Sequence, residues 1–183
     1  MTRSLLYGLG GLLLGLLIHL VVILTLPALA RDGVAARVDA VVPDTNKTVL
    51  FGDLRADDPN PFRLDPDLTY ALCRMNLKEG PGEVVATLPT SFWSVAVFNR
   101  DGTVIYSTTN RDGIGQSLDL GIFDPGQTRL LAEQKIDINA GLLIVEAPTD
   151  DVFVLVRLAP PQAAVRARYQ AALSRLNCRN IKI

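Results

Sequence analysis

The sequence predicts an α+β domain with a mainly antiparallel sheet and flanking helices, preceded by one N-terminal transmembrane helix. Residues 5–26 contain no Asp, Glu, Lys or Arg. As a helix this run would extend roughly 33 Å, which is enough to cross a bilayer core. The rest of the chain carries short β-branched and aromatic runs bounded by turn residues, a pattern typical of strands. The expected strands and helices do not alternate regularly, which favours α+β over a repeated βαβ fold.

The apolar segment can be interpreted as an uncleaved membrane anchor or as a cleaved signal peptide. The signal peptide is possible because Ala28-Leu29-Ala30 fits a cleavage site. The uncharged run exceeds the ~7–15 residues usual for a signal peptide, which favours an uncleaved anchor. Arg3 favours a cytoplasmic N-terminus and therefore an exported C-terminal domain. The expected parts are a transmembrane signal-anchor over 1–30, a juxtamembrane connector over 31–50 and the exported domain over 51–183.

One face of the expected membrane helix carries small and polar residues at steps of three and four. Small residues at this spacing let two helices approach closely in lipid, and an intramembrane His prefers a polar partner to lipid. We therefore expect a bilayer-embedded helix that can pack against a second copy, although glycine is also common in membrane helices generally. The residues of this helix-packing face are Ser4, Gly8, Gly11, Gly15 and His19.

The first half of the exported part begins with turn residues over 57–61. Asp65-Pro66 resembles an N-cap followed by Pro at the first helical position, which predicts a short helix through residues 70–73 that ends near Gly80. Asp-Gly pairs at 101–102 and 112–113 predict tight turns, and therefore an antiparallel meander. The strands expected here cover 83–88, 92–98 and 103–109.

The second half mixes two further helices with three strands. Asp124, Pro125 and Gln127 form a capping-box pattern that starts a helix ending near Lys135. Strands are expected over 118–123, 142–147 and 152–159, the last two as a hairpin across 148–151. After Pro160-Pro161 a last helix is predicted, whose apolar face consists of Val165, Tyr169, Ala172, Leu173 and Leu176.

Cys73 and Cys178 are the only cysteines, and they lie 105 positions apart. This spacing fits neither a metal site nor a redox pair. In an oxidising compartment we expect one disulfide that ties the early helix to the C-terminal segment. Two independent buried thiols remain the alternative.

Composition excludes several classes of function. A net charge of −1 removes the basic field that nucleic-acid binders need. His19, within the expected span, is the only histidine, so the exported part can build neither a His-containing catalytic triad nor a His-containing zinc site. No phosphate loop or dinucleotide fingerprint is present, and we assign no catalytic residue, metal or cofactor.

Three groups of side chains remain as candidates for binding. Five carboxylates over 53–67 lack the ligand spacing of a calcium loop and are interpreted as turn formers and a helix cap. Arg168, Arg175 and Arg179 share one flank of the last helix and could meet lipid headgroups, a partner or this acidic stretch. Trp93, Tyr106 and Phe98 lie in the central hairpin and could line a pocket, with Trp93 and Tyr106 as the candidate ligand-facing residues. Aromatics on a half-buried strand more often belong to a core.

The order of several short motifs resembles a known family. The motifs are Asp65-Pro66-x-Leu68, Ala71-x-Cys73-Arg74, Gly80-Pro81, Phe92-Trp93-Ser94, Asp101-Gly102, Tyr106 and a Cys-terminated last helix. On these motifs the chain is similar to the small membrane-anchored bacterial proteins of the domain-of-unknown-function family twelve-fifty-four, known mostly from alphaproteobacteria. The resemblance implies a bacterial inner-membrane location with a periplasmic domain, and it implies no activity.

Two functions follow as expectations. The first is a non-catalytic, single-span inner-membrane protein whose disulfide-bonded periplasmic domain serves interaction or assembly with an envelope protein. The alternative is an extracytoplasmic module that binds a small ligand in the manner of a sensor. An envelope hydrolase is the least favoured hypothesis.

Overall fold

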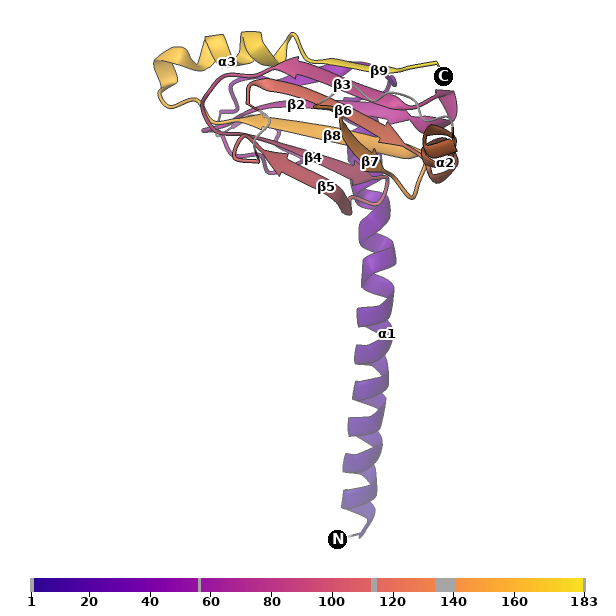
Figure 1. Ribbon diagram of the computed structural model, residues 1–183. Coiled ribbons are helices and arrows are strands. Elements are labelled where there is room, and N and C mark those ends of the chain that lie inside the picture. Colours follow the sequence, from indigo (N-terminus) through magenta and orange to yellow (C-terminus); the bar gives the residue numbers. More distant parts are fainter. Residues whose placement is uncertain (1, 56, 113–114, 134–140, 183) are drawn as a thin grey trace.

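The computed structural model describes residues 2–55, 57–112, 115–133 and 141–182. A long helix, α1 (Thr2–Val41), projects from a domain built of two β-sheets, and its N-terminus lies far from the sheets (Figure 1). The helix runs unbroken through Pro27 and ends just before Pro43, which cannot continue a helix. The segment expected as a connector thus holds the end of α1 and the start of the first strand.

The larger sheet has five antiparallel strands in the order β1-β2-β8-β4-β5. The smaller has the order β7-β6-β3-β9, in which β6 and β7 pair in parallel and the other neighbours are antiparallel. The strands of the larger sheet are β1 (Thr48–Phe51), β2 (Thr69–Asn76), β4 (Trp93–Asn99), β5 (Val104–Thr109) and β8 (Asp151–Leu158). The smaller sheet consists of β3 (Gly82–Thr87), β6 (Ser117–Phe123), β7 (Leu143–Glu146) and β9 (Asn177–Asn180).

The main core lies between the two sheets. Alternate residues of each strand face it, so that Trp93, Val95 and Val97 of β4 are fully buried there. The short helical elements surround the sheets and add side chains such as Tyr169 and Leu173 to this core. They are η1 (Leu77–Glu79), α2 (Pro125–Glu133), η2 (Ala163–Val165) and α3 (Arg166–Leu173).

The second face of the five-stranded sheet is also covered, by the end of α1 and by the loop over residues 52–68. Val38 of α1 and Val42, which directly follows the helix, are buried against Leu72 of β2 and Phe153 of β8. The central strands β2, β4 and β8 are therefore packed on both faces and are nearly continuous buried runs.

This double coverage explains why the helix expected through residues 70–73 is wrong. The segment is strand β2, paired with β8 along its whole length from Thr69 to Asn76. Asp65 caps a turn instead of a helix, since its carboxylate accepts from the backbone N–H of Asp67. A short apolar run without alternation fits a buried strand and a helix equally well.

The local hairpin predictions are half right. The turn at Asp101-Gly102 joins β4 to β5 as an antiparallel hairpin. The expected meander is wrong, because the chain after Asp112 leaves the five-stranded sheet and enters β6 of the other sheet. The expected hairpin of residues 142–147 and 152–159 is also wrong, since β7 pairs with β6 and β8 lies between β2 and β4. Gly113 lies outside the described residues.

The two predicted later helices are present. Asp124 and Gln127 form the expected capping box, in which each backbone N–H donates to the side chain of the other residue at 2.8–2.9 Å. The expected end of this helix, Lys135, lies outside the described residues. Helix α3 ends at Leu173, earlier than expected, and Cys178 lies in strand β9.

Candidate functional site

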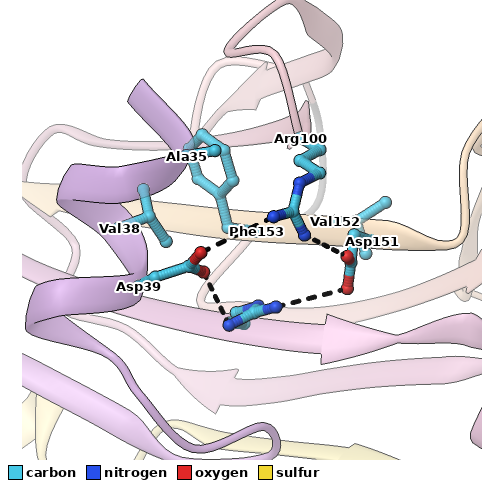
Figure 2. A pocket seen from close by; sticks show the side chains of 8 residues that line it. Ala35, Val38, Asp39, Arg100, Asp151, Val152 and Phe153 are labelled. Atoms are coloured by element: carbon cyan, nitrogen blue, oxygen red, sulfur yellow. Dashed lines mark hydrogen bonds and ion pairs between the residues drawn. The ribbon is translucent and has the colours of Figure 1, made fainter. Parts of the chain in front are cut away.

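The junction between α1 and the five-stranded sheet carries a closed ring of four charged side chains. Asp39 comes from α1, Arg74 from β2, Arg100 from the β4–β5 turn and Asp151 from the start of β8. Figure 2 shows Asp39 and Asp151 on opposite sides of the Arg100 guanidinium. Four elements that are distant in sequence thus meet at one point on the surface of the domain.

Each guanidinium in the ring bridges both carboxylates. Arg74 lies 2.7 Å from Asp39 and 3.6 Å from Asp151, whereas Arg100 lies 2.7 Å from Asp151 and 3.7 Å from Asp39. The hydrogen bond to Asp151, together with the charges of both carboxylates, raises the pKa of Arg100. Two positive and two negative charges balance, so the ring carries no net charge that would recruit a counter-ion.

The hollow beside this ring is too small for a ligand. Its volume is about 10 Å³, which is room for roughly one water molecule. The side chain of Arg74 is only 19% exposed, so it is largely shielded from competing solvent. We interpret the ring as a clamp that fixes the direction of α1 relative to the sheet.

Next to this clamp lies a larger cavity of about 220 Å³. Val34 and Val38 of α1 form one wall, and the sheet contributes Leu72, Phe98 and Leu155. Among the described residues, no charged side chain lines it. The lining consists of Val34, Val38, Phe51, Phe62, Leu64, Leu72, Phe98, Gly102, Phe153 and Leu155.

The loop over residues 52–68 covers this cavity with Phe62 and Leu64. Asn60 stabilises the loop, because its side-chain amide donates to the Leu64 carbonyl at 2.7 Å and accepts from the Leu64 N–H at 2.8 Å. Arg37 of α1 donates to the Pro61 carbonyl at 3.1 Å. The ring of Phe62 meets Phe51 edge-on at 5.8 Å. The loop is therefore attached to both the helix and the sheet.

The β4–β5 turn closes another side of the cavity at Gly102. This residue has φ of +85°, a conformation that favours glycine. A Cβ atom there would lie 3.0 Å from a methyl group of Val34. The glycine is thus needed both for the turn and for the close approach to α1.

The two candidate ligand-facing residues lie away from this cavity, whereas Phe98 of the same hairpin lines it. Trp93 is fully buried in the core between the sheets, and its indole N–H has no hydrogen-bond partner among the described residues. Tyr106 is half-buried and packs against the same core. Phe98, on the opposite face of β4 from Trp93, lines the cavity and stacks on Phe153 with ring centroids 4.9 Å apart.

The expected disulfide is confirmed. Cys73 and Cys178 are bonded, with their Cα atoms 6.5 Å apart. The bond joins β2 of the larger sheet to β9 of the smaller one, so it fastens the two sheets across the main core. The early element it ties is a strand instead of the expected helix.

The helix-packing face of α1 is exposed along its length. Ser4, Gly8, Gly11, Gly15 and His19 all lie on the bare part of the helix. A Cβ atom added to Gly8, Gly11 or Gly15 would meet no other described residue within 4 Å, apart from the neighbouring turns of the helix itself. One helix segment, Thr2–Leu26, is long and apolar enough to cross a membrane.

The basic flank expected on the last helix is wrong, because α3 ends at Leu173 and Arg179 lies in strand β9. Arg166 of α3 lies 3.6 Å from Asp53 and donates to the Pro66 carbonyl at 2.7 Å, so it holds the acidic loop against α3. Arg179 pairs with Glu83 at 2.6 Å. Arg168 and Arg175 are exposed on α3 and just after it. Within the described ranges, no group of three or more His, Cys, Asp or Glu side chains could hold a metal ion.

Sequence reasoning missed both the clamp and the cavity. The four clamp residues have no characteristic spacing, because their meeting depends on the strand order β2-β8-β4. A weak signal exists in Arg74 and Asp151, which are charged residues at the ends of otherwise apolar strands. The sequence does not group Phe51, Phe62 and Phe98, since they come from a strand, a loop and another strand.

Comparisons with known proteins identify the domain without assigning a function. A family described as "Protein of unknown function (DUF1254)" matches residues 45–177. No curated protein matches the chain.

Among solved structures, the VPA0106 protein from Vibrio parahaemolyticus is similar in fold, with a TM-score of 0.56 at 9% sequence identity. The match covers 83% of this chain and 35% of that one, so the chain spans about a third of its length. An uncharacterized protein from Burkholderia cenocepacia gives a TM-score of 0.46 at 13% identity, covering 82% of this chain and 40% of that one.

Proposed function

The chain belongs to the DUF1254 family, and from that premise we propose that it is a non-catalytic, single-span inner-membrane protein whose periplasmic domain serves interaction or assembly. The observation that carries the proposal is the continuity of α1. One helix contains the apolar segment Thr2–Leu26 and also the residues that pack on the sheet. A domain attached in this way is presented at a fixed height above a bilayer.

The contacts at the end of α1 support a rigid attachment. Val38 and Val42 are buried against the sheet, and Asp39 between them enters the charged clamp. Apolar burial and ion pairing thus act within one turn of helix. A protein whose role was only to tether a freely tumbling domain would need neither contact, whereas a platform for a partner needs a defined orientation.

The disulfide supports export of the domain. A structural disulfide persists in oxidising compartments and is rare in the cytoplasm, and Cys73 and Cys178 are fully paired. Arg3 at the other end of the apolar segment favours a cytoplasmic N-terminus. Together these features support an inner-membrane protein with its domain in the periplasm.

Assembly through the membrane helix has a direct test. We expect Gly11→Cys in the full-length chain to form a disulfide-linked dimer in membranes treated with a mild oxidant, because Gly11 lies on the small-residue face. Gly10→Cys is the matched control, since it lies roughly 140° away from the centre of that face at about 100° per residue. Equal dimer formation at both positions, or at neither, would contradict self-association through this face.

A second candidate function is favoured by the apolar cavity. A cavity lined by apolar side chains suits a small ligand of low polarity, and its volume of about 220 Å³ exceeds the ~150 Å³ that holds benzene in an engineered apolar cavity. The domain would then act as a small-ligand module in which the ligand contacts α1 directly. Occupancy could change how firmly α1 is held.

A further inference from the structure

We propose that the cavity between α1 and the five-stranded sheet takes part of one acyl chain of a membrane phospholipid. The proposal rests on the membrane anchoring proposed above and names the ligand class of the second candidate function. Two observations on the molecule support it: the chemistry of the lining and the place of the cavity along α1.

The lining is suited to a hydrocarbon chain. Aromatic rings of Phe51, Phe62 and Phe98 and aliphatic side chains of Leu64 and Leu155 surround the cavity. Phe51, Phe62 and Leu155 are only partly buried even though they pack against the buried residues Val38, Val42, Leu72 and Phe153. Exposed apolar surface inside a concavity is stabilised when an apolar ligand displaces water from it.

The position of the cavity along α1, close to the proposed membrane surface, favours a lipid over a freely dissolved ligand. Val34, in the cavity wall, follows the uncharged residue Ala30 by four positions, which is about 6 Å along a helix. Measured from Leu26, the end of the apolar segment, the distance is about 12 Å. The headgroup layer is roughly 5–7 Å thick on each side of the bilayer. The cavity wall therefore begins at that layer when the span ends at Ala30, and about 5–7 Å beyond it when the span ends at Leu26.

The polar surroundings of the cavity fit the rest of the lipid. Arg37 is exposed on α1, one residue before Val38 of the cavity wall, and its guanidinium reaches the covering loop at Pro61. A guanidinium is well matched to a phosphate. An acyl chain that bends out of the bilayer into the cavity would leave its headgroup near this arginine.

The covering loop provides an entry route. The loop has little regular structure between β1 and β2, and it covers the cavity through Phe62 and Leu64. The loop is held by hydrogen bonds from Arg37 and Arg166, by the Arg166–Asp53 ion pair and by the Phe51–Phe62 contact. Each of these is individually weak. Movement of this loop would open the cavity without disturbing the sheets.

Photolabelling in a bilayer tests the proposal. The full-length chain would be reconstituted into phosphatidylethanolamine vesicles that contain a phospholipid with a diazirine on one acyl chain, and labelled residues would be mapped by mass spectrometry after illumination. We expect labels in the segment 5–26 and also on cavity residues such as Phe62, Leu64 or Phe98. In a parallel arm, a free fatty acid with the same diazirine replaces the phospholipid.

Cavity-filling variants make the result specific. Leu155→Trp places a bulky ring in the cavity, and Leu64→Trp does so from the loop in case the first variant folds poorly. Either variant should lose the cavity labels and keep the labels in 5–26. Ile144→Trp is the matched control, because Ile144 is 41% exposed on the smaller sheet, and it should keep both sets.

The outcomes separate this inference from the membrane anchor. Labels in 5–26 without cavity labels would overturn the lipid site and leave the anchor standing. The absence of labels in both places would overturn the anchor. Cavity labels that persist in both filling variants, or that come only from the free fatty acid, would overturn the assignment to a phospholipid acyl chain in this cavity.

Discussion

Loss of the Cys73–Cys178 disulfide is expected to destabilise the domain strongly. The bond closes a loop of 105 residues and fastens β2 of one sheet to β9 of the other. In the chain-entropy treatment, closing a loop of this length stabilises the folded state by about 4.7 kcal/mol. A domain of ordinary size is stable by only about 5–15 kcal/mol, so the bond is a large part of the total.

The expected shift in melting temperature follows from this value. One kcal/mol corresponds to about 2–4 °C for chains of 150–250 residues, so reduction should lower the Tm by about 10–20 °C. Cys73→Ser and Cys178→Ser should each give a drop of this size, and the double variant should be no worse than either single one. The reason is that one substitution already removes the whole cross-link.

The assay uses the full-length chain in detergent, with and without a phosphine reductant. Thermal unfolding is followed by the fluorescence of Trp93, which lies in the core between the sheets. Intact mass after alkylation, measured on protein taken from an oxidising compartment, reports the state of the thiols. Two alkylated thiols, or a Tm unchanged by reduction, would refute the reasoning.

Other predictions concern the clamp, the β4–β5 turn and the response to acid. Arg74→Leu should lower the free energy of unfolding by about 1.5–3 kcal/mol, because it removes a shielded partner of two carboxylates. Arg100→Leu changes a side chain that is 54% exposed and should cost only about 0.2–1 kcal/mol. Chemical denaturation of both variants measures the difference. Gly102→Ala should cost roughly 1–2 kcal/mol through its positive φ, measured in the same way. Hydrogen bonds from the Thr109 N–H and the Thr108 hydroxyl lower the pKa of Asp112, so this carboxylate stabilises the fold above its ordinary pKa, and the stabilisation is lost as the pH falls through the lowered value. The Tm difference between wild type and Asp112→Ala should therefore be full at neutral pH and shrink below about pH 4, and a difference that grew on acidification would contradict the assignment.

The parts of the fold that depend on local sequence could be predicted. The apolar helix, the capping box at Asp124, the β4–β5 hairpin and the disulfide all follow from spacing and residue type within a short stretch or from a count of cysteines. The alternation along β4 was also predictable, since Trp93 and Phe98 lie on opposite faces as their positions require.

The sheet order and the site could not be predicted in the same way. Strand β8 pairs with β2 across a sequence gap that holds five other strands, and no local pattern encodes that choice. Because both faces of this sheet are covered, β2 lost the alternation that would have marked it as a strand. The clamp and the cavity could not be predicted for the same reason, since their residues meet only when the sheet is assembled against α1.

The central claim is that α1 remains attached as a membrane anchor for a domain on the far side of the bilayer. The most direct measurement is the intact mass and N-terminal sequence of the chain recovered from cells after alkaline carbonate extraction of the membranes. The proposed function predicts a full-length chain, with residues 5–26 present, that stays in the extracted membrane pellet. A chain released into the supernatant, or one whose mature N-terminus is Arg31, would contradict the claim.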